Sequence, residues 1–567
     1  MSVIVVSNRV SRVEPDDPIA GGLAAALLPM IKDSGAIWVG SSGQGSAAAQ
    51  TRDFAKIESL GSGVLATVDM PAKHYRGYYE GFANSALWPA LHSRPDLIHV
   101  VADDYTSYRE INAFMARALL RFNGPDAVFW IQDYHLLTLG AELRRLEVNR
   151  PIGFFLHTPW ADRRTFAAVP HDAELVEAML AYDLIGFQTI EDCHHFEDYL
   201  RAELGLMVVD GTAVSKWGPT RLATFPVGID VDAISARATK AVGRPEVVRL
   251  RESLHGAKLV LGVDRIDYSK GLANRMHAID RMLELEPSLK RKVSLLQIAV
   301  PSRGNITAYR ELKTELAALV GEINGRHGEV DWMPIRYLSK GFSQLTLAGC
   351  YRVASVGLVT PLHDGMNLVA KEYVAAQNPI DPGVLVLSSF AGAAKELDAA
   401  LQVNPHDIDG MARQITTALA MTPEERCERW QSMVSKLRAT PLQYWFSDFL
   451  RTFPTCKATR CAWQPQQSNL PYSRISQAPD VGWWSRPVFL TSFCPPRAPL
   501  RPPSCESVSL ILRDTICASA DLLLLSVSMI GLSAEPIFPL PQPIGAAVFV
   551  ALSRLLRRSA SCGSARY

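Results

Sequence analysis

The chain has 567 residues, of which 20% are charged and 48% are hydrophobic, and its formal net charge is +1. This length suits two or three domains with sizeable cores, and the composition is that of an ordinary globular protein. A charge so close to zero excludes a general electrostatic attraction to nucleic acid or to an anionic membrane, so local groups must hold any anionic ligand.

The first segment, MSVIVVSNRV, predicts a β-strand and lacks the basic flank, apolar core and cleavage site of a signal peptide. The cysteines of residues 1–455 are Cys193, Cys350 and Cys427. Such sparse cysteine indicates a reduced compartment and argues against a disulfide framework. We therefore expect a cytoplasmic protein.

Strand-like and helix-like segments then alternate along most of the chain. The strand VIVVSN precedes the helix GGLAAALLPMIKD and the strand AIWVG, and the same order returns in AVFWIQ, LLTLGAELRRL and IGFFLH. The pattern weakens at the charged connector RATKAVGRPEVVRLRESLHG and restarts with KLVLGVDRIDYSKG. This alternation predicts an α/β fold with two Rossmann-like parallel-sheet domains, residues 1–235 and 236–455.

Residues 456–567 differ from the rest of the chain. They hold the other six cysteines and concentrate Pro, Ser and Arg without clear periodicity. The apolar run DLLLLSVSMIGLSA is too short to cross a membrane and is flanked by Asp521 and Glu535. We interpret this segment as an irregular, disordered appendage, either a divergent extension or the product of a shifted reading frame.

Several polar residues of the first domain follow predicted strands, where ligands bind in open parallel sheets. Gly21 and Gly22 open a helix and can admit a phosphate, or they form an ordinary turn. Asp133 follows AVFWIQ; taken alone it is better interpreted as a helix N-cap than as a ligand of sugar hydroxyls. His157 follows IGFFL, and a lone histidine there more often has a structural role.

Two further segments carry aromatic and cationic groups. Tyr79 and Trp88 lie in YYEGFANSALWPALH and suit stacking on a sugar, although two core aromatics is the ordinary interpretation. Arg265 and Lys270 lie in DRIDYSKG and can neutralise a diphosphate, or they form local salt bridges with the neighbouring aspartates.

The segment TPLHDGMNLVAKEY is the strongest of these signals. Asp364 can accept hydrogen bonds from sugar hydroxyls, the amides after Gly365 can hold a phosphate, and Glu372 can accept from a ribose diol. Because every one of these segments follows a predicted strand, their common placement favours one interdomain cleft that binds a nucleotide sugar.

The segments together resemble the α,α-trehalose-6-phosphate synthases, which are retaining glycosyltransferases of the GT-B architecture. The resemblance spans residues 1–455 and rests on SNRV, GGLA, YYEGFANSALWPALH, WIQDYHLL, GFFLHTPW, YDLIGFQT, FPVGID, DRIDYSKGL, PSRGN, VTPLHDGMNLVAKEYVAAQ and GVLVLSSFAGAAKEL. It implies transfer of glucose from UDP-glucose to glucose 6-phosphate, with no cofactor and no metal. We also expect a homo-oligomer, with no nucleic-acid or membrane partner.

The resemblance also implies roles for individual residues. The donor would be bound by Gly21, Gly22, His157, Arg265, Lys270, Phe342, Asp364, Leu368, Val369, Ala370, Lys371 and Glu372. The acceptor would be bound by Arg9, Tyr79, Trp88, Asp133 and Arg303, the last at its phosphate. The chemistry would depend on Arg265, Lys270, Asp133, His157 and Asp364.

The chain departs from the usual pattern of the family at a few positions. Ser41 stands where the family usually has Trp, Gln132 where it has His, and His363 where it has Arg. Two alternatives therefore stay open. One is a related retaining glucosyltransferase that uses ADP- or GDP-glucose, or glycerol 3-phosphate as acceptor. The other is an inactive regulatory homologue.

Overall fold

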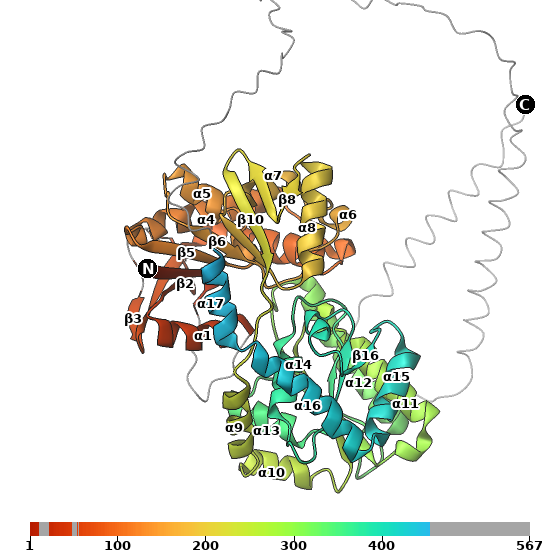
Figure 1. The fold of residues 1–567 in the computed structure, drawn as a ribbon. Coiled ribbons are helices and arrows are strands. Elements are labelled where there is room, and N and C mark those ends of the chain that lie inside the picture. Colours follow the sequence, from red (N-terminus) through yellow and green to blue (C-terminus); the bar gives the residue numbers. More distant parts are fainter. Residues whose placement is uncertain (11–21, 48–53, 55, 454–567) are drawn as a thin grey trace, which may run out of the picture. The chain divides into compact units, whose positions relative to one another are not determined.

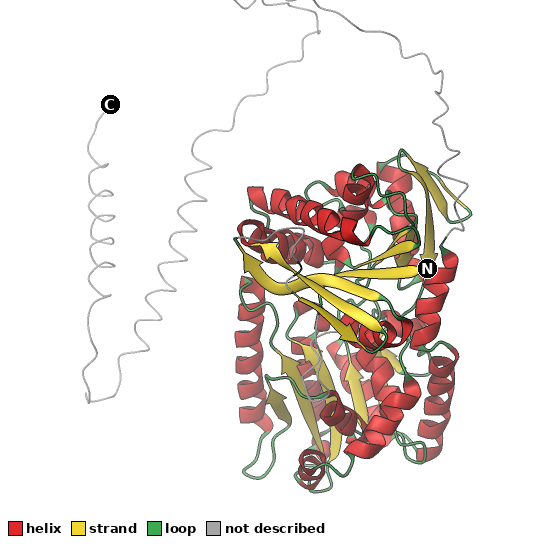
Figure 2. Cartoon of the chain, turned by 90° about the vertical axis from the view of Figure 1, so that its left-hand side faces the viewer, coloured by secondary structure: helices red, strands yellow, loops and turns green. Residues whose placement is uncertain are grey.

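The computed structural model describes residues 1–10, 22–47, 54 and 56–453. The predictions for Gly21 and for residues 456–567 lie outside these residues. Within them the chain forms two β-sheets, each with its own helices (Figures 1 and 2). We call the first sheet with its helices the first lobe, and the second sheet with its helices the second lobe.

The sheet of the first lobe has the order β3-β4-β2-β1-β5-β6-β7-β10-β9-β8. Its central strands pair in parallel, and the antiparallel pairs lie at its two edges: β3 with β4, β10 with β9, and β9 with β8. The strands are β1 (Ser2–Arg9), β2 (Ile37–Ser46), β3 (Lys56–Leu60), β4 (Gly63–Pro71), β5 (Ala127–Gln132), β6 (Ile152–Phe155), β7 (Leu184–Phe187), β8 (Val208–Val209), β9 (Thr212–Ser215) and β10 (Gly218–Thr224).

Helices cover both faces of this sheet. The apolar run of β1 shows why, since successive side chains of a strand point to opposite faces. Val3 and Val5 pack in one hydrophobic cluster, whereas Ile4 and Val6 pack in another. The helical segments are α1 (Gly22–Ser34), α2 (Ala72–Arg76), the π-helix η1 (Gly77–Leu87), α3 (Trp88–Leu91), η2 (Pro95–Leu97), α4 (Ala102–Leu119), η3 (Leu120–Phe122), η4 (Tyr134–Leu136), α5 (Leu139–Arg145), α6 (Arg163–Phe166), α7 (Asp172–Met179) and α8 (Ile190–Glu203).

The sheet of the second lobe is parallel throughout and has the order β13-β12-β11-β14-β15-β16. Its strands are β11 (Lys258–Arg265), β12 (Val293–Val300), β13 (Ile335–Leu338), β14 (Val356–Val359), β15 (Val384–Ser388) and β16 (Leu401–Val403). The same alternation holds, because Leu259 and Leu261 face one cluster and Val260 faces the other. Two such sheets confirm the predicted fold class, whereas the division at residue 235 stays a prediction.

The helical segments of the second lobe are α9 (Val231–Ala241), α10 (Pro245–Glu252), η5 (Tyr268–Lys270), α11 (Leu272–Leu285), η6 (Pro287–Leu289), α12 (Thr307–His327), α13 (Gln344–Val353), α14 (Leu368–Ala376), η7 (Gly392–Lys395), α15 (Ile408–Ala420) and α16 (Pro423–Ala439). The last described helix, α17 (Leu442–Thr452), returns to the first lobe. Its Trp445 and Phe449 pack against Trp130 of β5, with ring centroids 4.8 and 4.7 Å apart.

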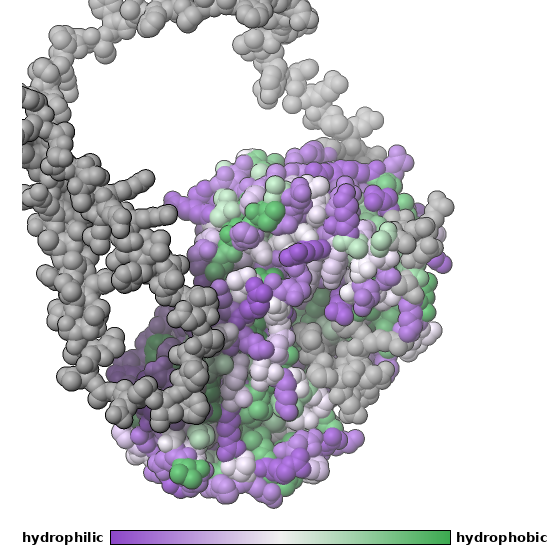
Figure 3. Space-filling view, turned by 180° about the vertical axis from the view of Figure 1, so that it is seen from behind, coloured by the Kyte–Doolittle hydropathy of each residue, from purple (hydrophilic) through white to green (hydrophobic). Residues whose placement is uncertain are grey.

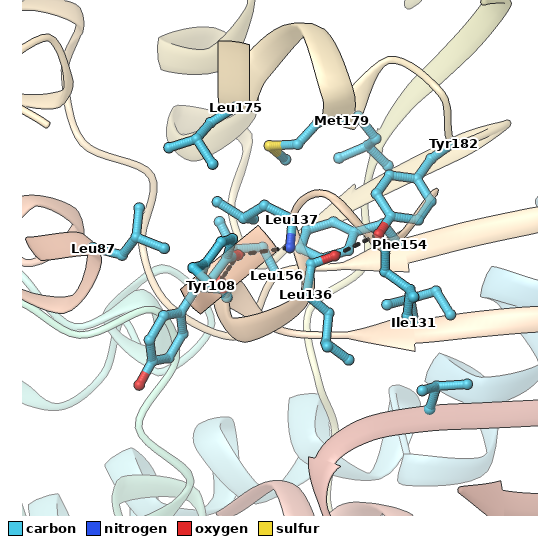
Figure 4. Packing of buried hydrophobic residues seen from close by; sticks show 14 of the residues in the cluster. Leu87, Tyr108, Ile131, Leu136, Leu137, Phe154, Leu156, Leu175, Met179 and Tyr182 are labelled. Carbon is cyan, nitrogen blue, oxygen red and sulfur yellow. Dashed lines mark hydrogen bonds between the residues drawn. The ribbon is translucent and has the colours of Figure 1, made fainter. Parts of the chain in front are cut away.

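The larger core cluster of the first lobe also holds the turn that follows β5. Figure 4 shows Tyr108 and Tyr182 among the apolar side chains around Leu136 and Leu137. The hydroxyl of Tyr108 donates to the carbonyl of Tyr134 and accepts from the amide of Leu137. The hydroxyl of Tyr182 donates to the carbonyl of Leu136 at 2.6 Å. Buried tyrosines thus fix the backbone beside Asp133.

Hydrophilic and hydrophobic side chains are intermixed on the face of the described residues that Figure 3 shows. None of the helices formed by the described residues combines the length and the apolar character needed to cross a bilayer.

The packing of α17 gives a stability prediction. Phe449 is 0% exposed, so Phe449→Ala leaves a cavity against Trp130 and should lower the free energy of unfolding by about 3–5 kcal/mol. Tyr444→Ala on the same helix removes a side chain that is 47% exposed and should cost less than about 0.5 kcal/mol. Urea unfolding followed by tryptophan fluorescence measures both changes, and equal losses of stability would contradict the packing of Phe449 against Trp130.

Candidate active site

Asp133 follows β5 in a backbone conformation that few residues other than glycine adopt, with φ 75° and ψ 167°. Asp133 stands at the N-cap position of η4, but its side chain forms no capping hydrogen bond; its Oδ1 accepts a hydrogen bond from the amide of His157 at 3.2 Å. The interpretation of Asp133 as an N-cap is therefore correct for its position in the chain but not for its side chain, which forms no capping bond. Burial raises the pKa of this carboxyl to about 6. Strain of this kind collects at functional sites, where the surrounding packing maintains it.

His157 lies beside Asp133, after β6. Its Nε2 lies 2.9 Å from Oε1 of Gln132, the last residue of β5. Burial lowers the pKa of His157 to about 3, so the ring is neutral at pH 7. Because a carboxamide oxygen only accepts, the contact favours the tautomer protonated at Nε2, with Nδ1 left as an acceptor.

In the second lobe, Lys270 and Asp364 form an ion pair of 2.6 Å. Lys270 follows β11, and Asp364 follows β14. Oδ2 of Asp364 also accepts from Nδ2 of Asn367 at 2.9 Å. Burial on its own would raise the pKa of Asp364, but the charge and hydrogen bond of Lys270, together with His92 and Asn367, outweigh burial and lower the pKa. The cation predicted for the diphosphate thus binds the carboxylate predicted for the glucose.

The predicted salt bridges of Arg265 and Lys270 with the neighbouring aspartates are wrong. Asp264 pairs with Arg275 at 2.7 Å, and Asp267 pairs with Arg303 at 3.0 Å. Arg265 forms no ion pair with any residue that the structure describes. Its guanidinium lies 5.7 Å from the ring of Trp88, so an unpaired cation stands at the end of β11.

Gly365 shows how closely the two lobes approach at this point. A Cβ on Gly365 would lie 2.3 Å from the carbonyl oxygen of His157. No side chain fits there, so glycine allows the loop of the second lobe to contact the first lobe. The structure thereby brings Asp364 near His157 and Asp133, as the common placement at strand ends predicts.

The start of α14 has features that favour an anion. Asn367 has a left-handed backbone (φ 75°), and its Oδ1 accepts from the amide of Ala370 at 3.2 Å. Leu368 and Val369 form the first turn, where unpaired amides and the helix dipole favour negative charge. This placement fits the role that the resemblance implies for these two residues, and Ala370 is buried behind them.

The next two residues of α14 differ in what they contact. Lys371 is 0% exposed and donates to Oε1 of Glu396 and to the carbonyl of Val227, both at 2.7 Å. Its ammonium therefore bonds to groups of the protein itself in this structure. Glu372 accepts from the hydroxyl of Tyr351 at 3.3 Å, and burial raises its pKa to about 7. Glu372 can thus change charge close to neutral pH.

The residues predicted for the acceptor lie on the opposite side, in the first lobe. Tyr79 of η1 stacks on Tyr75 and on His135, with ring centroids 5.8 Å away in both cases. Trp88 begins α3 and is 5% exposed. Its ring lies under the guanidinium of Arg303, 3.8 Å from Cζ to the ring centroid. The interpretation of Trp88 as a core aromatic is therefore incomplete, because it also contacts a predicted ligand of the acceptor phosphate.

Arg9 ends β1 and is exposed, and its guanidinium lies against the turn at Gly43. Ser41 pairs with Arg9 in the register of β1 and β2 and is 1% exposed. The departure at Ser41 thus lies next to a predicted acceptor residue. Phe342 packs at the edge of a core cluster of the second lobe, and Gly22 is the first residue of α1.

Sequence reasoning missed the contacts of two residues here. Asp267 is 0% exposed and connects Trp88 with Arg303; an acidic residue between two cations at a strand end was the available signal. His363 places Nδ1 3.1 Å from the hydroxyl of Ser93 in the first lobe, a contact that no local pattern indicates. Among the described residues, no group of three or more His, Cys, Asp or Glu could hold a metal ion.

Known proteins share this arrangement of sequence and fold. The model of the family described as glycosyltransferase family 20 matches residues 7–455. A trehalose-6-phosphate synthase of Enterobacter sp. (strain 638) is 41% identical over 450 residues, which is 79% of this chain and 94% of that protein.

Two solved structures extend the likeness to three dimensions. An α,α-trehalose-phosphate synthase (UDP-forming) from Burkholderia xenovorans, in complex with glucose-6-phosphate, has a TM-score of 0.78 and 42% identity, covering 80% of this chain and 100% of that one. A structure from E. coli bound with UDP-2-fluoro glucose has a TM-score of 0.75 and 38% identity, covering 80% and 99%. With a matching family model over residues 7–455 and relatives at this identity, the chain belongs to glycosyltransferase family 20.

Proposed function

We propose that the protein transfers glucose from UDP-glucose to glucose 6-phosphate with retention, giving α,α-trehalose 6-phosphate and UDP. It is a UDP-forming trehalose-phosphate synthase, as its relatives are named. One relative binds glucose-6-phosphate and another a fluorinated UDP-glucose. Because a regulatory homologue would be expected to lose donor-site groups, their presence here favours an enzyme.

The main support for the proposal is that cationic residues of the second lobe and an aromatic residue of the first lobe lie close together. Arg265, Lys270 and Asp364 lie at the carboxyl ends of β11 and β14, the edge where parallel sheets bind nucleotides. Trp88 faces them from the first lobe, with Arg265 5.7 Å from its ring. A cationic set suited to a diphosphate and an aromatic set suited to a sugar therefore share one site.

The reaction follows from these charges. The bond between C1 of glucose and the diphosphate oxygen breaks, and the acceptor hydroxyl forms a new bond to C1 on the same face. The departing phosphate oxygen takes the proton of that hydroxyl. Arg265 and Lys270 neutralise the charge that develops on the diphosphate, so the scheme assigns no task to a metal ion.

Lys270 would change partners during this cycle. It is bound to Asp364 in this structure, and a diphosphate would share its ammonium. Asp364 would then turn its oxygens to the hydroxyls of the transferred glucose. Asp133 and His157 would contact the two sugars from the first lobe, where the strained backbone of Asp133 fixes its carboxylate.

An assay of UDP-glucose, ADP-glucose and GDP-glucose against glucose 6-phosphate and glycerol 3-phosphate tests the proposal. We expect nucleotide release to be fastest, by at least about tenfold in kcat/KM, with UDP-glucose and glucose 6-phosphate. Faster release with another pair would identify a related transferase, and no release with any pair would favour a regulatory homologue.

We expect Arg265→Ala and Lys270→Ala each to lower kcat by at least about a hundredfold, because each removes a charge that stabilises the leaving group. Steady-state UDP release measures both. Arg281→Ala removes a surface cation that pairs with Asp409, and it should retain turnover within about twofold. Near-normal kcat in both site variants would contradict the mechanism.

Glu372 predicts a pH dependence of nucleotide binding. Its pKa of about 7 leaves it largely protonated at pH 6, and a protonated carboxyl accepts fewer hydrogen bonds from a ribose diol. The Kd for UDP should therefore rise by up to about tenfold between pH 8 and pH 6. Calorimetry on Glu372→Gln should show a much flatter profile. If the Kd for UDP changed with pH equally in the wild type and in Glu372→Gln, the titrating group would be a residue other than Glu372.

Glucose 6-phosphate and UDP-glucose are thus the proposed small-molecule partners. Cytoplasmic location, homo-oligomeric assembly and the absence of a cofactor stay predictions from the sequence.

A further inference from the structure

The carboxylate of Asp267 has a complete set of partners although none of its surface is exposed. Its Oδ1 accepts from the amide of Ser269 at 3.1 Å and from Nε1 of Trp88 at 3.3 Å. Its Oδ2 accepts from Nη1 of Arg303 at 3.0 Å and from the hydroxyl of Tyr309 at 3.3 Å. A buried charge with this many donors is held in one position.

These contacts cross from one lobe to the other. Asp267 and Arg303 belong to the second lobe, whereas Trp88 and Tyr134 belong to the first. Besides the bond from Trp88 to Asp267, Nη2 of Arg303 donates to the hydroxyl of Tyr134 at 3.0 Å. The face of the same guanidinium covers the ring of Trp88 at 3.8 Å. The ion pair is therefore fully bonded only while the lobes are together.

The charge of Asp267 makes this contact energetically significant. Burial on its own would raise its pKa, but the cations around it, chiefly Arg303 and Arg265, outweigh burial and lower the pKa. The group is thus a carboxylate at pH 7. Loss of a hydrogen-bond donor to a buried carboxylate is costly, so Asp267 favours the arrangement in which Trp88 and Arg303 are both in place.

The position of Asp267 along the chain connects it with the donor. It lies between Arg265 and Lys270, in the segment that a diphosphate bound to these two cations would contact. Its partners Trp88 and Arg303 are the residues proposed to hold the acceptor. One short segment therefore contacts both halves of the site.

We propose that Asp267 is a positioning residue that couples the binding of the nucleotide to the binding of the sugar phosphate. A diphosphate held by Arg265 and Lys270 fixes the segment, and Asp267 then holds Trp88 and Arg303 in the geometry that the acceptor needs. The inference rests on the proposed function, because that function assigns a nucleotide to one half and a phosphorylated sugar to the other.

Calorimetric titration of the wild-type protein and of Asp267→Asn tests the coupling. The Kd for glucose 6-phosphate is measured without UDP and with saturating UDP. We expect UDP to tighten binding by at least about fivefold in the wild type, and by less than about twofold in Asp267→Asn. The amide keeps the shape but loses the charge that holds Arg303. By linkage, glucose 6-phosphate should tighten UDP binding by the same factor.

Two further variants separate coupling from stability. Asp264 lies in the same segment as Asp267 and forms a buried ion pair with Arg275. Asp264→Asn breaks that pair, so it should destabilise the fold while keeping the wild-type coupling factor. Trp88→Phe keeps a ring but removes the hydrogen-bond donor to Asp267, so it should also lower the coupling factor. It takes the place of Asp267→Asn in the test if that variant fails to fold.

An unchanged coupling factor in Asp267→Asn, or in Trp88→Phe if the first variant does not fold, would overturn the inference. A wild-type protein without coupling would overturn it as well. The failure of the proposed function is a different result, since the wild type would then release no UDP from UDP-glucose and glucose 6-phosphate. Normal release without coupling would leave the function intact and reject the role of Asp267.

Discussion

Buried charges at the carboxyl ends of two sheets constrain this structure. Each carboxylate or cation that leaves water there needs a partner, because an unpaired buried charge costs several kcal/mol. Lys270 finds Asp364 and Arg303 finds Asp267, at 2.6 and 3.0 Å. In the second pair, Asp267 also accepts a hydrogen bond from Trp88, and Arg303 donates one to the hydroxyl of Tyr134, so these charges help to hold the two lobes together.

The other residues of the site depend on backbone conformations that cost free energy. Asp133 has a backbone in a region that suits glycine, and buried tyrosine hydroxyls fix the turn behind it. Gly365 leaves room for the carbonyl of His157, which any side chain would displace. The packing of the two sheets offsets the free-energy cost of these strained or crowded positions, so the site has a rigid support on both sides.

Much of the fold could be predicted from the sequence, because buried parallel strands are nearly continuous apolar runs. VIVVSN, AVFWIQ and KLVLGV become β1, β5 and β11 with few changes at their ends. The candidate site could be predicted in outline for a related reason, since polar residues that follow such runs collect at one edge of a sheet. Their partners could not be predicted. Asp267 pairs with Arg303 rather than with a cation next to it in the sequence, and Lys371 forms an ion pair with Glu396.

The alternation of strands and helices, the polar residues at strand ends and the family to which these segments belong can all be recognised in the sequence alone. Those properties are local, since apolar periodicity, glycine and short motifs act over a few residues. Which charges pair, which residue is strained and where the lobes contact each other depend on contacts between residues that are distant in the chain. Asp267 and Trp88 are far apart in the chain, and no local preference specifies that the indole should donate to this carboxylate.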